Sequence, residues 1–333
     1  MKFLQGLFQF LIWSFYQLGD ERGSISIPMA WVHQFTPMLL QTMQQKTSLV
    51  KTQLGARSMR SGVSAAIDTW ERVGNVLLQP IGRHTQTVQL NPNHTRRGAT
   101  MQSVGGGILL SPNVDVVRML IQPQSDYREL LASAAVQSID KAILDGSIGA
   151  ATTITTSGTT GQLTYGSQGM LTAHQIGTST AMSLTRIIAA SVLLSKASVP
   201  TGAKARAFFY SPGQETDILA ITQASSSDFT KNRIHDAGTI DGNDWEGFRW
   251  VQIPDVVDET TAVLVNMLNL VSTTRSCIAM YRDGVGYSSA QDPQTNISTR
   301  NDLNNEIQVY LSLTMGVVRL WEGSVVQVDA LEN

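Results

Sequence analysis

The side chains with the chemistry for catalysis or metal binding are few and widely spaced in this sequence. Its histidines are His33, His84, His94, His174 and His235. None of them stands in an HExxH motif or at metal-ligand spacing from another histidine. His235 and Asp236 are adjacent, and neighbours in sequence do not share one face of a helix. A loop or helix-cap role is therefore favoured over a hydrolytic pair, which stays an alternative.

The single cysteine, Cys277, excludes a disulfide framework and a cysteine-based zinc site. It lies in an apolar, strand-like run, which predicts a small buried side chain. Asp255, Asp258 and Glu259 lie close together near Pro254, a grouping that allows a cation site. A solvated loop is the favoured interpretation of these carboxylates.

Two glycine-rich motifs lack the context that a nucleotide site requires. Gly158–Gly161 is not followed by the Gly-Lys-Ser/Thr of a phosphate loop, so no lysine would neutralise a phosphate. Gly105–Gly107 lacks the strand–turn–helix context of a dinucleotide fingerprint, and the sequence holds no Gly-x-Ser-x-Gly elbow. The sequence predicts no catalytic, cofactor-binding or metal-binding residues and no enzymatic activity.

Charge is scarce and unevenly distributed. The 333 residues are 42% hydrophobic but only 15% charged, against about 25% charged in typical globular proteins. Uncharged polar surface costs little to desolvate against another protein. Residues 1–100 contain ten Lys/Arg and four Asp/Glu, a net of +6, so residues 101–333 carry a net of −8. This asymmetry favours self-association or contact with a polyanion.

Six arginines fall within or just before a segment that is predicted below to form a hairpin. They are Arg57, Arg60, Arg72, Arg83, Arg96 and Arg97. Nucleic-acid binding would normally add interleaved aromatic residues or a recognisable module, and Trp70 is the only aromatic residue in this span. We therefore predict salt-sensitive contact with acidic surfaces of neighbouring copies rather than sequence-specific binding.

The first 18 residues combine one lysine with an apolar run that glutamines interrupt (MKFLQGLFQFLIWSFYQL). The run is short for a membrane span, and no small-residue cleavage site follows it. Aliphatic and aromatic residues recur at helical spacing over residues 3–18, which predicts an amphipathic arm that buries this face against a partner. A lipid-facing helix and a signal peptide are the alternatives.

The clearest predicted helix spans residues 125–146. Ser125 and Asp126 are candidates for its N-cap, and Glu129 three residues after Asp126 completes a capping-box pattern. Apolar residues follow at a spacing of four, and Gly146 is expected to end the helix. The apolar stripe is rich in alanine, so we expect another element to pack close along it.

Two further helices and one helical patch are predicted. Ser183–Lys196 has an apolar side made of Leu184, Ile187, Ile188 and Val192. Ser211–Gln214 begins another helix, with serine as the N-cap and proline at the first helical position. The patch covers residues 38–50.

Short strand-like pieces separated by glycine and proline predict a long β-hairpin excursion from Gly62 onward. The pieces are 63–67, 76–78, 85–90 and 108–110. Residues 146–181 are rich in Gly, Thr and Ser and predict a β-excursion or a mobile loop. Further strands are expected at 205–210, 248–253, 262–267, 277–281, 307–318 and 325–328, with a turn at Glu322-Gly323 joining the last two. A few helices among many non-consecutive strands indicate the α+β class.

In this order of parts, the chain resembles the major capsid proteins of tailed phages with the Hong Kong 97-type coat fold. The local similarity is to a phage capsid protein family over roughly residues 35–330. It is carried by Phe35–Leu54, His94–Met101, Asn113–Gly146, Ala207–Gln214, Ser227–Phe229 and Gly247–Pro254. The resemblance implies an α+β fold with an N-arm, an extended β-hairpin loop, a peripheral domain with a long spine helix, and an axial domain.

The resemblance also implies domain limits. They are 1–60 for the N-terminal arm, 61–112 for the extended loop, 113–181 for the peripheral domain with spine helix 125–146 and flexible loop 147–181, 182–305 for mainly the axial domain, and 306–333 for C-terminal strands that return to the peripheral domain.

The implied function is a major capsid protein that self-assembles into pentamers and hexamers of an icosahedral phage head around double-stranded DNA. The implied partners are copies of the chain itself, scaffolding, portal and cement proteins, and packaged DNA through non-specific contact, with no membrane expected. The implied location is the virion capsid, assembled in the host cytoplasm. The alternative is another self-assembling virion component, either a tail tube or a decoration protein.

Overall fold

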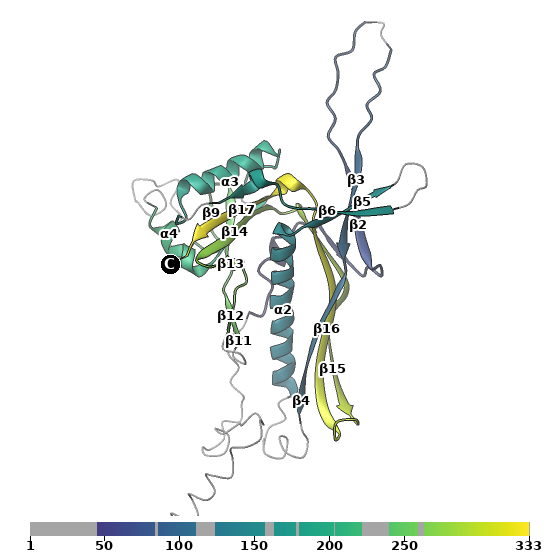
Figure 1. The fold of residues 1–333 in the computed structure, drawn as a ribbon, viewed down its shortest axis with the longest axis vertical. Coiled ribbons are helices and arrows are strands. Elements are labelled where there is room, and N and C mark those ends of the chain that lie inside the picture. The colour runs from purple at the N-terminus through teal and green to yellow at the C-terminus, as the bar shows by residue number, and fades with distance from the viewer. Residues whose placement is uncertain are drawn as a thin grey trace, which may run out of the picture.

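The computed structural model describes residues 45–83, 86–110, 124–156, 163–177, 180–202, 204–221, 240–258 and 263–332. Figure 1 shows an elongated molecule: a long helix and a long sheet run down one part, an α/β body lies beside their upper end, and a loop projects beyond the top. The predicted arm 3–18, the motif Gly158–Gly161 and the pair His235 and Asp236 lie outside the described residues.

A four-stranded sheet forms the long part of the molecule. In the order β1-β15-β16-β4, its strands are Met59–Ser61, Val285–Arg300, Glu306–Arg319 and Gln102–Leu110. The central strand β16 pairs antiparallel with both β15 and β4. Alternate residues of β16 are buried, as the two-residue period of a strand requires when one face is covered. They are Val309, Leu311, Leu313 and Met315.

Helix α2 (Gln124–Ile148) covers that face of the sheet (Figure 1). Its 25 residues give a length of about 37 Å at 1.5 Å per residue. The stripe Ala135, Ile139 and Ile143 is buried in the same core as the inward residues of β16. The predicted helix 125–146 is therefore confirmed in type and in its buried side.

The predicted end signals of this helix are wrong. Ser125 and Asp126 lie inside the helix rather than before it, and Gly146 also lies inside it. A Cβ at Gly146 would stand 2.6 Å from Cγ1 of Val317 on β16. Glycine is required here because the helix backbone passes close to the sheet, and not because the helix ends.

A seven-stranded sheet forms the core of the α/β body. In the order β7-β17-β14-β8-β10-β9, with β13 also on β14, its strands are Gln175–Ile176, Val325–Leu331, Thr274–Tyr281, Arg206–Tyr210, Phe248–Gln252, Asp244–Trp245 and Leu270–Val271. Strand β8 lies between β14 and β10, and all five of its residues are buried. Strands at 205–210, 248–253, 277–281 and 325–328 are confirmed within a few residues.

Helices α3 (Leu184–Lys196) and α4 (Pro212–Leu219) pack on this sheet. Both segments are predicted to be helices, and both predictions are confirmed in type and to within one residue of the start. The apolar side predicted for α3 is wrong in part. Ile188 and Val192 are 43% and 44% exposed, whereas Ala190 and Leu194 are buried. The buried stripe is rotated because it follows Ile187, Ala190 and Leu194 at spacings of three and four.

A separate four-stranded sheet carries the projecting loop. In the order β2-β3-β5-β6, its strands are Ile67–Val73, His94–Thr100, Ala151–Thr156 and Leu163–Gln168. Strands β2 and β3 pair from Ile67↔Thr100 to Val73↔His94, which leaves residues 74–93 as the connecting loop. The hairpin excursion is confirmed, but the predicted strands 76–78 and 85–90 are not strands over their described residues, which pair with no other strand.

The remaining short elements are β11 (Val256–Asp258), β12 (Val263–Val265) and the 3-10 turns η2 (Lys51–Gln53), η4 (Thr172–His174) and η5 (Glu322–Ser324). The predicted helical patch 38–50 is wrong over its described part, because residues 45–50 form a bend and a turn before η2. The mobile-loop alternative for 146–181 is also wrong where β5 and β6 form a hairpin. The run of Thr and Ile in β5 suits a strand, since β-branched side chains favour the extended backbone.

The two last strands do not form a hairpin. Turn η5 joins them as expected, but β16 belongs to the long sheet and β17 to the seven-stranded sheet. The return of residues 306–333 to the peripheral domain stays a prediction. Strand β15 was not predicted, because its sequence is polar and contains Pro293.

We expect Gly146→Ala to lower the free energy of unfolding by about 1–2 kcal/mol, because crowding against Val317 outweighs the roughly 1 kcal/mol helix preference of alanine. Gly106→Ala is the matched control: a Cβ there meets nothing within 4 Å, so stability should be unchanged or slightly raised. Urea unfolding of the unassembled chain measures both. A stabilising Gly146→Ala would contradict the close-approach argument.

Candidate assembly interface

The projecting loop 74–93 exposes aliphatic side chains that its own chain does not cover. Leu77, Leu78 and Ile81 are 81%, 88% and 76% exposed. At the base of the loop, the amide of Gly74 donates a hydrogen bond to the carbonyl of Asn93 at 2.7 Å, and this bond follows directly on the pairing of β2 with β3. Clustered exposed aliphatic residues on an outstretched segment mark a protein-interaction surface.

Stacked arginines brace the base of this loop. The guanidinium of Arg60 lies 4.7 Å from the ring centroid of buried Trp70 and donates to Asp68 at 3.0 Å. The guanidinium of Arg72 stacks on Trp321 at 4.8 Å. Such cation–π contacts hold planar groups face to face. They fix the direction in which β2 and β3 leave the molecule.

One carboxylate, that of Glu322, neutralises two buried guanidinium groups. It binds Arg97 on β3, whose side chain is 3% exposed, and Arg319 on β16, which is fully buried. Arg319 also donates to the carbonyl oxygens of Ser147 and Gly149 at the end of α2, at 3.0 and 2.8 Å. Burial lowers the pKa of Arg97, while the charge of Glu322 opposes that shift.

The predicted contact with neighbouring copies is wrong for Arg97, whose buried guanidinium pairs with Glu322 of the same chain. Arg60, Arg72 and Arg97 bind as just described, and Arg96 forms an ion pair with Glu71 at 2.6 Å. Arg83 near the loop tip and Arg57 are exposed. Contact with neighbouring copies stays a prediction for all of the six except Arg97.

A second buried carboxylate fixes the segment 45–50 to α2. Asp140 is 1% exposed and accepts hydrogen bonds from the amides of Leu49 and Val50, at 2.9 and 3.2 Å. It also accepts from the side chains of Gln45 and Ser48. The sequence carries only part of the signal for this role: Asp140 follows Ile139 of the apolar helix stripe, whereas the amides that it binds lie about 90 residues earlier in the chain.

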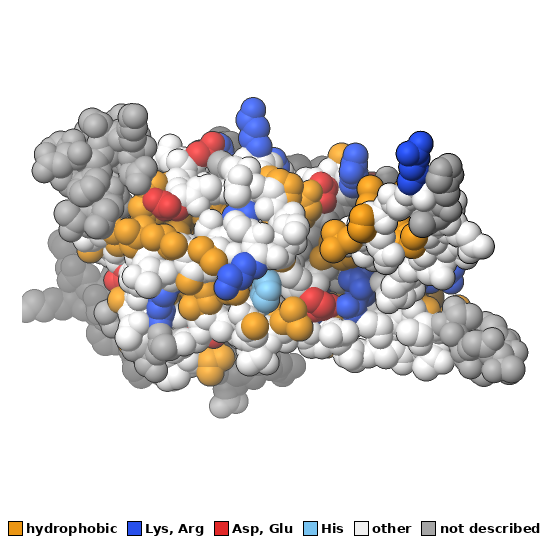
Figure 2. Space-filling model, turned by 90° about the horizontal axis from the view of Figure 1, so that it is seen from above, with side chains coloured by type: hydrophobic (Ala, Val, Ile, Leu, Met, Phe, Trp, Pro, Cys, Tyr) orange, Lys and Arg blue, Asp and Glu red, His pale blue; other side chains and the backbone are white. Residues whose placement is uncertain are grey.

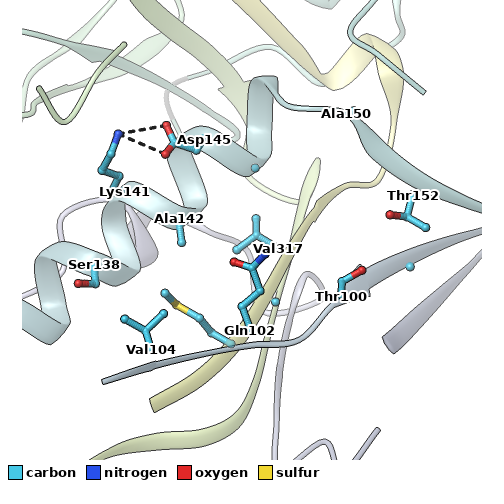
Figure 3. Close-up of a pocket in the computed structure, with 14 residues that line it drawn as sticks. Thr100, Gln102, Val104, Ser138, Lys141, Ala142, Asp145, Ala150, Thr152 and Val317 are labelled. Carbon is cyan, nitrogen blue, oxygen red and sulfur yellow. Dashed lines mark hydrogen bonds and ion pairs between the residues drawn. The ribbon is translucent and has the colours of Figure 1, made fainter. Parts of the chain in front are cut away.

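A groove of about 520 Å³ lies between α2 and strands β3, β4, β5 and β16 (Figure 3). Most of its lining is small or uncharged, with Thr100, Gln102 and Thr152 among the labelled residues. Its two charged residues are Lys141 and Asp145, which pair with each other at 3.2 Å. The two charges in the groove therefore neutralise each other.

The other described candidates also serve structural roles. His94 is exposed at the start of β3, and His174 is buried with Nδ1 3.2 Å from the carbonyl oxygen of Val325. Asp255 binds both terminal nitrogens of buried Arg275, at 3.0 and 2.7 Å, so the predicted solvated position is wrong for this residue. Within the described ranges, no three His, Cys, Asp or Glu side chains gather as a metal site would need.

Cys277 is fully buried on β14, which confirms the prediction of a small buried side chain. Its thiol donates to Oε1 of buried Gln214 on α4. Burial raises the pKa of this thiol. A thiol that stays protonated and inaccessible is not a nucleophile.

A long helix packed on a long sheet and a projecting loop with an uncovered aliphatic surface are the features of a protein that acts through contact with other chains. The sequence matches the model of the phage capsid protein family over residues 27–332, and the chain belongs to this family. It is a major capsid protein of a phage head shell and resides in the virion capsid. No curated protein matches the sequence.

Solved phage structures share the fold. The capsid of cyanophage P-SCSP1u aligns with a TM-score of 0.64 at 12% identity and covers 91% of this chain and 94% of its own. The head structure of Helicobacter pylori bacteriophage KHP40 aligns with a TM-score of 0.64 at 10% identity, covering 93% and 98%. Mycobacterium phage Che8 gives 0.59 at 14% identity, covering 89% and 96%. The α+β, Hong Kong 97-type fold is thus confirmed.

Among the helices that the structure describes, none is long and apolar enough to cross a membrane.

We expect Glu322→Gln to destabilise the chain by about 3–5 kcal/mol, because it leaves the buried charges of Arg97 and Arg319 without their carboxylate. Asp302→Asn is the control, since its ion pair with Arg300 is exposed and should contribute nothing measurable. Urea unfolding compares the two variants. Equal stability of both would show that Glu322 is not the required counter-charge.

We expect the native chain to resist thiol labelling at pH 8, because Cys277 is buried and its pKa is raised. One thiol per chain should react after unfolding in urea. The absorbance of released thionitrobenzoate measures this. Rapid labelling of the folded chain would place Cys277 at an accessible site.

Proposed function

We propose that copies of this chain form the pentamers and hexamers of an icosahedral head around double-stranded DNA, and that outstretched segments hold them together. The observation that carries this proposal is the exposed aliphatic surface of loop 74–93. Leu77 and Leu78 would be unfavourably hydrated in a lone chain, so a neighbouring copy is expected to cover them.

The strength of the shell would come from the number of contacts rather than from any large one. A subunit held by several neighbours experiences a high effective concentration of each, so modest interfaces suffice. Figure 2 shows the upper face of the molecule: few charged side chains are visible, and most of the visible described surface is uncharged. Such a surface is cheap to desolvate during assembly.

The domain roles follow from the same proposal. Residues 1–60 would be the arm and 61–112 the extended loop. Helix α2 with the long sheet supports a peripheral domain, and the seven-stranded sheet with α3 and α4 supports an axial domain. Because β15 lies in the long sheet and β17 in the other, we place β15 with the peripheral part and β17 with the axial part.

The further partners belong to this proposal as well. Scaffolding, portal and cement proteins would bind the assembled copies, and the packaged DNA would touch the inner surface without sequence preference. Assembly would take place in the host cytoplasm, and the chain would have no enzymatic activity. The internal pairing of Lys141 with Asp145 in the groove and the burial of Cys277 support a purely structural role.

We expect a variant with Leu77→Ser, Leu78→Ser and Ile81→Ser to fold with unchanged thermal unfolding and to lose closed shells, because the exposed apolar surface that drives loop docking is gone. Val271→Ser, at a 64% exposed residue on β13, is the matched control and should assemble normally. Electron microscopy of particles from cells that also express the phage assembly partners measures shell yield. Normal shells from the triple variant, or open tubes and rings from the parent, would contradict the proposal.

A further inference from the structure

Strand β6 (Leu163–Gln168) has a free edge. It ends the sheet β2-β3-β5-β6, and among the described elements it pairs with β5 alone. All six of its residues are exposed, with Leu163 at 45% and Tyr165 at 54%. The outward amides and carbonyls of such a strand are a ready template for another strand.

Proteins usually block such an edge with charges, proline or a bulge. Strand β6 (LTYGSQ) contains no charged residue and no proline, and its register with β5 runs without a shift from Ala151↔Gln168 to Thr156↔Leu163. Two of its carbonyl oxygens accept from side chains of the same chain: Gln168 from Arg319 at 3.2 Å and Thr164 from Thr155 at 3.4 Å. The opposite edge strand, β2 (IDTWERV), carries three charged residues. The two edges of one sheet are thus protected very differently.

Residues 74–79 (GNVLLQ), the first limb of the projecting loop, are also uncharged and belong to no strand in the described chain. Their own β6 is out of reach, because the β2–β3 ladder fixes the root of the limb and strands β3 and β5 lie between it and β6. Figure 1 shows the loop rising away from the sheet while the β5–β6 hairpin points sideways.

We propose that β6 of one copy accepts limb 74–79 of a second copy as an added antiparallel or parallel strand. The inference rests on the self-assembly proposed above and names the receiving surface. Main-chain hydrogen bonds would supply affinity, and alternate side chains would supply register. Val76 and Leu78 would then share one face of the enlarged sheet, and Leu77 would lie on the other.

Disulfide trapping in assembled shells tests this directly. Tyr165→Cys is combined in turn with Val76→Cys, Leu77→Cys and Leu78→Cys, and buried Cys277 is left in place. Strand pairing brings only side chains on the same face into reach. We expect Tyr165→Cys to crosslink either with positions 76 and 78 or with position 77, with at least tenfold more dimer on the favoured face than on the other. Mass spectrometry identifies the joined peptides.

Closed shells without any such crosslink, or with equal yields at all three positions, would overturn the inference and leave the proposed function standing. A maleimide–benzophenone reagent attached to Tyr165→Cys is the second readout, because its photo-crosslink needs no partner thiol. Crosslinks from this reagent to the first 44 residues, and not to the limb, would also overturn the inference, because another segment would then occupy the edge. Failure of the parent chain to form shells would instead contradict the proposed function.

A second variant places a charge on the edge without using cysteine. Tyr165→Lys should reduce shell yield at least tenfold with an unchanged thermal unfolding temperature, while Val271→Lys on β13 should leave it unchanged. Parental shell yield from Tyr165→Lys would overturn the inference.

Discussion

The neutralisation of two buried arginines by Glu322 is the interaction on which the arrangement of this subunit depends. Arg97 comes from the loop-bearing sheet, Arg319 ends the central strand of the long sheet, and η5 leads into β17 of the seven-stranded sheet. Three sheets therefore meet at one carboxylate. Separating these charges in a low-dielectric interior is costly, so the ion pairs fix the orientation of the three sheets relative to one another. The orientation of the loop that projects from one sheet therefore depends on its contacts with the other two.

The fixed orientation of loop 74–93 and its exposed aliphatic side chains both favour binding to a neighbouring copy. The loop at 74–93 leaves a base braced by Arg60 on Trp70 and Arg72 on Trp321. A flexible segment with the same aliphatic residues would lose more conformational entropy on binding. A loop with a fixed base loses less entropy, so more of the free energy gained by burying its aliphatic side chains remains as binding free energy. Modest contacts can then close a shell in which every subunit has several neighbours.

Much of this fold could be predicted from local signals. Helices α2, α3 and α4 follow apolar periodicity and, for α4, the Ser-Pro start, and these signals act within a few residues. What could not be predicted depends on partners far away in sequence. Gly146 has the pattern of a helix end until Val317 is placed beside it. Polar β15 is a strand because β16 pairs with it, and the roles of Asp140 and Glu322 appear only when distant backbone and arginine groups meet them.

The burial of Cys277 has a practical consequence for particles built from this chain. The native sequence supplies one cysteine, and it is hidden between β14 and α4. A single cysteine engineered at an exposed position would then be the only reactive thiol on each subunit. Repeated over a symmetric container, it would form a regular lattice of identical attachment points for dyes, antigens or catalysts, with a spacing set by the subunits themselves.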